Sequence, residues 1–119
     1  GCLFLGQLTE NQLATLYRKA SIFITASTHE GLCLPVLEAM SFGIPVIARN
    51  AAALPDTIGN TGILLPEKAG PELFAEAVCE LLDNPRLHQR FAKQGLRTSA
   101  EYSIEKTAAS FMNLIKGVL

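Results

Sequence analysis

Short apolar runs alternate with segments of helical periodicity along most of the chain, and this alternation limits the folds that the sequence can adopt. The expected strands are rich in branched and aromatic side chains and are bounded by turn-forming residues. They cover residues 3–5, 22–26, 45–48 and 63–65. Strands that alternate with helices form parallel sheets with crossover helices, whose ligands bind beyond the carboxyl ends of the strands. We therefore predict a doubly wound, Rossmann-like α/β fold.

Signals for helix starts and ends stand between these strands. Thr9 and Gln12 match a capping box, in which each side chain satisfies an N–H group at the start of a helix. Pro35 opens the next helix, because the missing N–H group of proline would be unpaired in a first turn. Gly43 is well placed to end that helix. The helices expected between the strands are thus supported by residues that typically begin or end a helix.

The last third of the chain is expected to be helical. An apolar stripe over residues 73–82 predicts one helix, Pro85 opens a second, and Ser103 caps a third. The sequence contains no internal repeat, low-complexity segment or linker rich in glycine and serine. We therefore expect residues 1–119 to form a single domain with C-terminal helices.

The composition excludes several classes of protein. With 119 residues, 49% hydrophobic content and a positive mean hydropathy, the chain can bury a substantial core. A net charge of −1 gives no reason to expect a nucleic acid as partner. The cysteines, Cys2, Cys33 and Cys79, are odd in number and form no Cys-x-x-Cys pair, so neither a disulfide framework nor a zinc site is indicated.

The cysteine pattern predicts a reducing compartment, and we expect a cytoplasmic location. The sequence has neither an apolar run long enough for a membrane span nor the basic and then apolar pattern of a signal peptide. Residues 1–6 are mostly apolar and lack an initial methionine, and they would make a poor edge in contact with solvent. We therefore expect the chain to be a piece of a longer protein.

Two carboxylates, Glu30 and Glu38, flank the expected start of the helix at Pro35. Glu38 is predicted at the end of the first turn, where free N–H groups and the helix dipole favour an anionic group such as a phosphate. Residues 36–42 are apolar nearly all round, which is typical of a buried helix. A lone carboxylate in such a helix needs a partner, and ligand hydroxyls would serve.

Structural interpretations of these residues stay open at this point. Glu38 can equally pair with a residue of its own fold, and Glu30 can be a solvated loop acid. His29 has the side chain of an acid or base, but a lone loop histidine is more often a surface residue. Cys33 is either a small packed side chain or a reactive thiol at a helix start.

With these residues in place, the chain resembles the second half of the nucleotide-binding C-terminal domain of retaining glycosyltransferases of family 4, which have the two-domain GT-B fold. The resemblance runs the whole length and is strongest over residues 27–40 and 42–48. It rests on Gly31, Leu34-Pro35, Glu38-Ala39-Met40 and Gly43-x-Pro45-Val46, which together match the E-x7-E region of that family.

The resemblance implies a role for each matching position. Glu30 is then a catalytic residue near the donor sugar, and Glu38 accepts hydrogen bonds from the ribose hydroxyls of the nucleotide. The main-chain amides that would face the diphosphate are those of Gly31, Leu32, Cys33 and Leu34. The family transfers a sugar from a nucleoside diphosphate sugar to a carbohydrate or lipid acceptor with retention. It usually needs no metal, and we expect no cofactor.

Several positions depart from the family pattern. Leu32 and Cys33 stand where the family usually has an aromatic residue and a glycine, residues 51–53 are alanines in a loop that tends to carry glycines, and Asp56 replaces a glutamate. The basic residues that clamp the diphosphate and the acceptor-binding N-terminal domain lie outside this chain, so the chain alone should be inactive. The alternatives are a non-catalytic nucleotide-binding or scaffolding module of the same fold and, ranked lower, a sugar-nucleotide epimerase of the GT-B type.

A basic stripe recurs at helical spacing after Pro85. Its members are Arg86, Arg90, Lys93 and Arg97. Asp83, Glu101 and Glu105 lie nearby and dilute this charge, so a solvated helix face is the favoured interpretation. The alternative is peripheral contact with an anionic membrane, where each basic side chain contributes about 1 kcal/mol.

Overall fold

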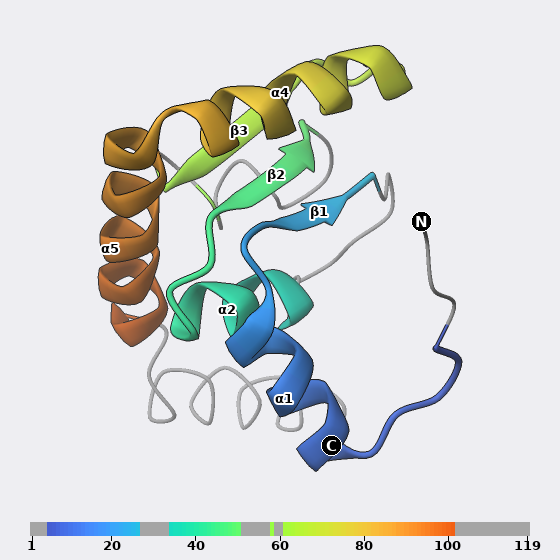
Figure 1. The fold of residues 1–119 in the computed structure, drawn as a ribbon, viewed down its shortest axis with the longest axis vertical. Coiled ribbons are helices and arrows are strands. Elements are labelled where there is room, and N and C mark those ends of the chain that lie inside the picture. The colour runs from blue at the N-terminus through green and yellow to red at the C-terminus, as the bar shows by residue number, and fades with distance from the viewer. Residues whose placement is uncertain (1–4, 27–33, 51–57, 59–60, 102–119) are drawn as a thin grey trace, which may run out of the picture.

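The structure is a computed structural model that describes residues 5–26, 34–50, 58 and 61–101. Its elements, shown in Figure 1, are α1 (Glu10–Lys19), β1 (Phe23–Thr25), α2 (Leu34–Ser41), β2 (Val46–Arg49), β3 (Gly62–Leu65), α4 (Pro71–Asp83) and α5 (Pro85–Glu101). Most of the strand expected at residues 3–5, and all of the helix expected after Ser103, lie outside the described residues. Both stay predictions.

The described strands form one parallel sheet in the order β1-β2-β3. In its register Ile24 lies opposite Ile47, and Ile47 lies opposite Ile63. The central strand is the most buried, because Val46, Ile47 and Ala48 are all 0% exposed. The prediction of a parallel α/β fold is therefore confirmed.

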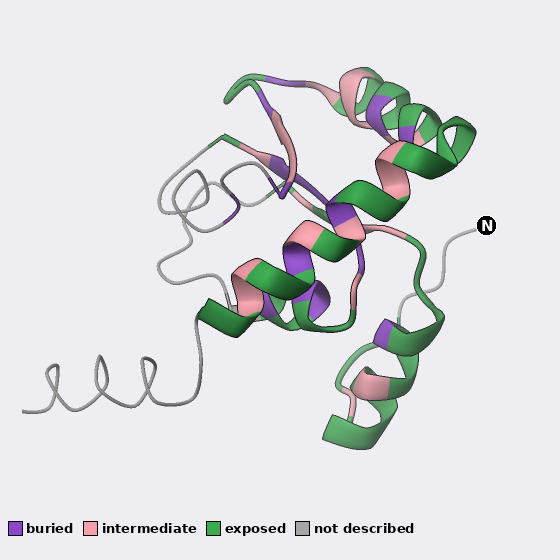
Figure 2. Cartoon of the chain, turned by 90° about the vertical axis from the view of Figure 1, so that its left-hand side faces the viewer, coloured by how far each residue is buried: buried purple, intermediate pink, exposed green. Residues whose placement is uncertain are grey.

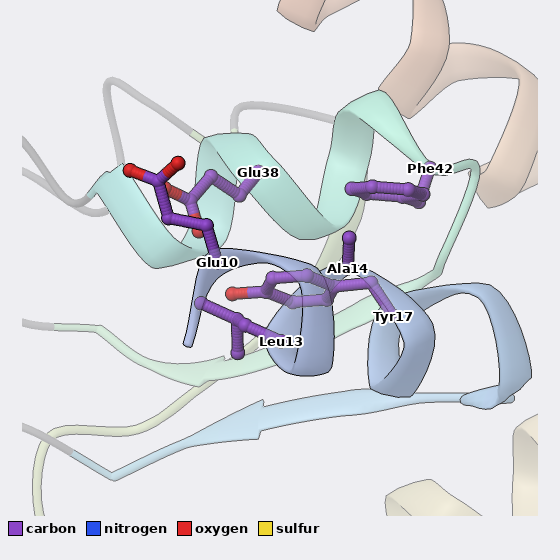
Figure 3. Close-up of a pocket in the computed structure, with 6 residues that line it drawn as sticks. All are labelled: Glu10, Leu13, Ala14, Tyr17, Glu38 and Phe42. Carbon is purple, nitrogen blue, oxygen red and sulfur yellow. The ribbon is translucent and has the colours of Figure 1, made fainter. Parts of the chain in front are cut away.

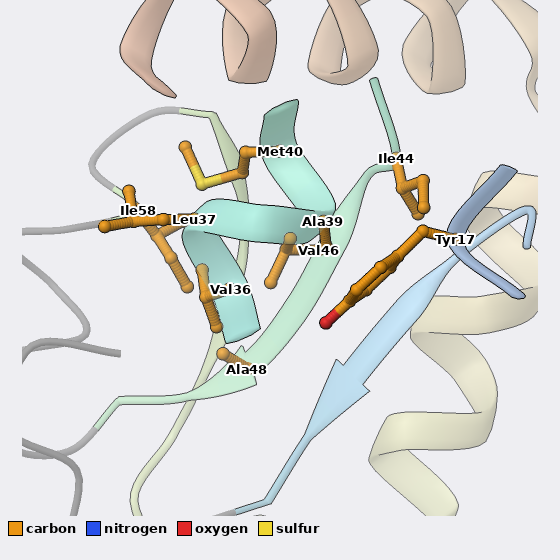
Figure 4. Packing of buried hydrophobic residues seen from close by; sticks show 9 residues of the cluster. All are labelled: Tyr17, Val36, Leu37, Ala39, Met40, Ile44, Val46, Ala48 and Ile58. Atoms are coloured by element: carbon orange, nitrogen blue, oxygen red, sulfur yellow. The ribbon is translucent and has the colours of Figure 1, made fainter. Parts of the chain in front are cut away.

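Helices cover both faces of this sheet. In Figure 1, α1 and α2 lie on one side of the strands and α4 lies on the other, while α5 runs beside the ends at which the strands begin. Because successive side chains of a strand point to opposite faces, β2 contributes to both cores. Val46 and Ala48 pack with α2 and Tyr17, as Figure 4 shows, and Ile47 packs with the α4 and α5 side.

The predicted helix signals act as expected at several positions. At the start of α1, the Thr9 hydroxyl accepts a hydrogen bond from the Gln12 amide at 3.2 Å, and the Gln12 side chain accepts one from the Thr9 amide at 3.0 Å. α5 begins at Pro85. Gly43 follows α2 with φ of 72°, a left-handed conformation that side chains other than glycine rarely adopt.

Candidate functional site

The expected site lies where β1 ends and α2 begins. β1 ends at Thr25, and α2 begins at Leu34, one residue before the predicted Pro35. Proline is tolerated in this first turn because the first four N–H groups of a helix have no partner within it. Glu38 consequently lies in the second turn of α2, which corrects its predicted place at the end of the first turn.

The predicted site residues divide into two groups. Leu34 is the first residue of α2, and Glu38 is an exposed residue on that helix. The others lie outside the described residues, namely Glu30, Gly31, Leu32 and Cys33. Their roles stay predictions, as do the effects of His29, Asp56 and the alanines at 51–53.

The expectation that α2 is a buried helix is confirmed for one side of the helix and wrong for the other. Val36 and Ala39 are 0% exposed and Met40 is 1% exposed, but Glu38 and Phe42 are exposed. The physical reason is that the sheet and α5 contact one side of α2, so a single stripe of the helix is buried. Among the described residues, none forms a side-chain hydrogen bond or ion pair with the Glu38 carboxylate. A ligand can therefore bind this group without displacing a described partner.

Glu38 lines a cavity of about 240 Å³ between α1 and α2. The other lining residues are Glu10, Leu13, Ala14, Tyr17 and Phe42. Figure 3 shows the carboxyl groups of Glu10 and Glu38 toward one end of this cavity and the ring of Phe42 toward the other. The cavity therefore combines an acidic end with apolar walls, which is the usual composition of a small-molecule site.

Tyr17 connects the two helices that bound the cavity. Its ring stacks on that of Phe42, with a centroid distance of 5.3 Å and an interplanar angle of 16°. Its hydroxyl donates a long hydrogen bond of 3.4 Å to the carbonyl of Pro35, at the start of α2. Tyr17 is also the buried residue of α1. Figure 2 shows how buried, intermediate and exposed residues are distributed along the chain. These contacts set the width of the cavity.

Glu10 is a member of this cavity that the sequence analysis did not identify. It is the first residue of α1, and the Thr9 capping box fixes where that helix begins. Acidic residues are common in the first turn of a helix because they interact favourably with its dipole. The residue type therefore gave no sign of a ligand-binding role, and the proximity to Glu38 depends on how α1 packs against α2.

The sequence analysis also did not identify Arg49, which lies at the carboxyl end of β2. Its Nε donates to the carbonyl of Ala26 at 3.1 Å, and one terminal nitrogen donates to the carbonyls of Glu67 at 2.7 Å and Ala69 at 2.8 Å. The guanidinium carbon lies 5.3 Å from the centroid of the Phe74 ring. Arg49 thus joins the end of β1 to the segment between β3 and α4, and it places a cation at the edge of the sheet where the strands end.

Three further kinds of site were considered among the described residues: a metal site, a membrane span and the basic stripe of α5. No group of three or more His, Cys, Asp or Glu side chains in the described ranges is arranged to hold a metal. None of the helices in this part of the chain has the length and hydrophobicity that crossing a bilayer requires. The basic stripe of α5 is exposed, as a solvated face would be, and contact with an anionic membrane stays a prediction.

Comparison with known proteins decides the family. The model of the family described as glycosyl transferases group 1 matches residues 1–98. The chain belongs to this family. The match includes α1, α2 and the sheet, so the cavity beside Glu38 lies within the part of the chain that the family model covers.

Individual relatives agree with this assignment. The O-antigen chain mannosyltransferase B of Escherichia coli is 29% identical over 113 residues, which are 95% of this chain and 29% of that protein. The sucrose-phosphate synthase of Thermosynechococcus elongatus superposes with a TM-score of 0.82 and 28% identity, over 98% of this chain and 30% of the other.

A third relative is the C-terminal domain of a glycosyl transferase group 1 family protein from Francisella tularensis, with a TM-score of 0.72 and 30% identity, over 87% of this chain and 53% of that one. The fold matches that of GT-B glycosyltransferases. The chain spans less than a third of the length of the mannosyltransferase, at 29%.

Proposed function

We propose that the chain is the donor-binding part of a glycosyltransferase that moves a sugar from a nucleoside diphosphate sugar to a carbohydrate or lipid acceptor, with retention of configuration. The observation that carries this proposal is the exposed Glu38 carboxylate, which lines a cavity between α1 and α2. Membership of the glycosyl transferases group 1 family supplies the class of reaction.

Each proposed role follows from a chemical property of the residue. Glu38 accepts hydrogen bonds from the pentose hydroxyls, because a carboxylate accepts and does not donate. The main-chain N–H groups of Gly31, Leu32, Cys33 and Leu34 face the diphosphate, since unpaired N–H groups at a helix start attract anions. Glu30 acts as the catalytic residue near the departing sugar.

The rest of the reaction is proposed to need a second domain. We propose that residues 1–119 form one structural unit, and that a preceding part of the same protein supplies the acceptor site and the basic side chains that complete the diphosphate clamp. This agrees with the 29% share of the mannosyltransferase that the chain covers. The isolated chain is then inactive, and the complete enzyme acts in the cytoplasm.

The test is a titration of the full-length protein with nucleoside diphosphates by calorimetry. Glu38→Ala should weaken binding more than about tenfold, because a hydrogen bond to a charged group contributes roughly 1.5–3 kcal/mol. Glu76→Ala, which removes an exposed glutamate from α4, is the matched control and should bind normally. Unchanged affinity in Glu38→Ala would refute the role of Glu38.

The same titration separates the enzyme from a non-catalytic scaffolding module of the same fold, which would bind no nucleotide. The presence of Cys33 where the family usually has glycine favours the module, because a side chain there hinders close approach of a phosphate. If no nucleoside diphosphate gives binding heat, the module is the better interpretation.

Transfer by the full-length enzyme should also persist in excess chelator, since the proposed site uses main-chain and basic groups in place of a metal.

A further inference from the structure

β1 is the outermost described strand on one side of the sheet. Among the described strands it pairs with β2 alone, so its outer edge has no described neighbour. The Phe23 N–H group donates to the Pro45 carbonyl at 2.9 Å, on the side of β2. Because successive residues of a strand present their main-chain groups to opposite sides, the N–H and C=O groups of Ile24 point away from β2. A further strand at the outer edge would pair with both groups.

The outer edge of β1 lacks the usual protection of an edge strand. Natural edge strands commonly carry charged side chains or proline, which prevent pairing with another strand. Residues 22–26 contain neither, and they are rich in the branched and aromatic side chains that favour strands. β1 therefore has the composition of a strand in the interior of a sheet.

The side chains of β1 are also covered less well than those of β3, the strand on the opposite side of the sheet. In β3, Leu64 packs against the core on the α2 side and Ile63 packs against the core on the α4 side. Ile24 lies opposite Ile47 and shares its face of the sheet, but Ile47 is 0% exposed and Ile24 is 47% exposed. Figure 1 shows the reason, because α4 lies on the β3 side of the sheet and β1 is the strand farthest from it.

The comparison with a solved domain indicates what covers this edge. The Francisella tularensis structure is that of a C-terminal domain, and this chain covers 53% of it, so nearly half of that domain has no counterpart in the matched residues. Parallel strands are joined by crossover connections, usually helices, which lie on the faces of the sheet. A further strand of the same domain would thus bring a helix with it.

Resting on the preceding part of the protein that the proposed function requires, we infer that this part supplies a parallel strand to the outer edge of β1 and a helix that covers Ile24. A second copy of the chain fits the edge less well. A two-fold axis would pair β1 with itself in the antiparallel direction, whereas all the described strands are parallel.

Hydrogen exchange in the full-length protein tests the strand pairing. Mass spectrometry with fragmentation that resolves single amides should find the Ile24 amide protected more than about a hundredfold over an unstructured amide. The Phe23 amide, which is bonded to Pro45, is the internal control and should be protected to a similar degree. Fast exchange at Ile24 beside a protected Phe23 would overturn the inference, because the outer edge would then be open to water.

Two variants of the full-length protein test the cover over Ile24. Ile24→Thr keeps a branched side chain that suits a strand, yet it should lower the midpoint of thermal unfolding by more than about 3 °C, because a hydroxyl is buried. Leu82→Gln is the control, a polar change at a 59% exposed leucine of α4, and it should shift the midpoint by less than about 1 °C. Equal small shifts would overturn the inference.

The same hydrogen-exchange data identify the segment that covers the edge. In Ile24→Thr, a peptide that precedes residue 1 should lose protection together with residues 22–26. Loss of protection in a peptide that follows residue 119, or a dimer that Ile24→Thr converts to a monomer in analytical ultracentrifugation, would assign the edge to another occupant and overturn the inference.

These outcomes are separate from those that test the proposed function. A full-length protein that protects Ile24 but binds no nucleoside diphosphate in calorimetry supports this inference and overturns the proposed donor site. A protein that binds a nucleoside diphosphate but leaves Ile24 unprotected overturns this inference alone.

Discussion

The two sides of the sheet are packed in different ways. On the side of α4, Ala77 and Leu81 are 7% and 1% exposed and form a continuous core with the sheet. On the other side, Tyr17 is the buried residue of α1, while Leu13 and Leu16 are 37% and 40% exposed. α1 therefore contributes little to the core that α2 forms with the sheet.

This difference in packing explains why the cavity lies on one side of the sheet and not on the other. The cavity beside Glu38 is present because α1 meets α2 mainly through one aromatic pair, Tyr17 and Phe42. On the other side of the sheet, side chains of α4 such as Ala77 and Leu81 pack directly against the strands. Regions with few buried contacts open at lower free energy than packed cores, so the side of the sheet with the cavity is expected to be the less stable one.

The largest effect should come from truncating a leucine on the packed side. Leu81→Ala should lower the free energy of unfolding by about 3–4 kcal/mol, because it leaves a cavity in a buried core. Leu16→Ala, the matched change on α1, should cost less than about 1 kcal/mol because Leu16 is already 40% exposed. Urea denaturation measures both values. Equal losses would show that α1 is packed as firmly as α4.

A smaller loss is expected at the close contact between β3 and β2. A Cβ on Gly62 would lie 2.5 Å from the carbonyl oxygen of Val46, which belongs to the main chain and cannot turn aside. Gly62→Ala should therefore lower stability by about 2–3 kcal/mol.

Gly95→Ala is the matched control for this contact. Its Cβ would lie 3.5 Å from Met40, an ordinary contact, and alanine favours the helix, so stability should rise by about 0.5–1 kcal/mol. Thermal unfolding of the two variants provides the comparison. A gain in Gly62→Ala would contradict the strand spacing described above.

A smaller loss of stability is expected at Arg49, whose hydrogen bonds link the end of β1 to the segment between β3 and α4. Arg49→Met keeps an apolar chain beside Phe74 but removes the bonds to the carbonyls of Ala26, Glu67 and Ala69. Stability should fall by about 1–2 kcal/mol, since Arg49 is partly exposed and water can replace some bonds. In urea denaturation, the unfolding midpoint of Arg49→Lys should lie between those of Arg49→Met and the wild type. An unchanged midpoint for Arg49→Met would show that these hydrogen bonds do not contribute to stability.

Much of the fold was predictable because its signals are local. The capping box at Thr9, the helix start at Pro85 and the left-handed Gly43 all follow from the backbone requirements of single residues or of neighbours. The parallel sheet followed from the alternation of strands and helices. α4, by contrast, begins at Pro71, two residues before the stripe that predicted it, because apolar spacing marks the buried face of a helix and not its end.

The candidate site was less predictable than the fold. The sequence analysis selected Glu38 as a carboxylate near the start of α2, but it did not predict that Glu38 is exposed. Apolar composition alone does not say how many sides of a helix are covered by other elements. Glu10 and Arg49 had no local signal of a role. Glu10 lines the cavity, and Arg49 bonds to the segment before α4, only through contacts with residues far away in the sequence.

By itself, the sequence determined the order of strands and helices, where most of them start, and the family that the segment from residue 27 to residue 48 resembles. These properties depend on side chains within a few positions of one another. Only the tertiary structure decided that Glu10 and Glu38 share a cavity, that α2 is buried on one side, and that Arg49 joins β1 to the segment before α4. The physical reason is that the packing of distant elements, and not the preference of any one segment, sets which side chains meet.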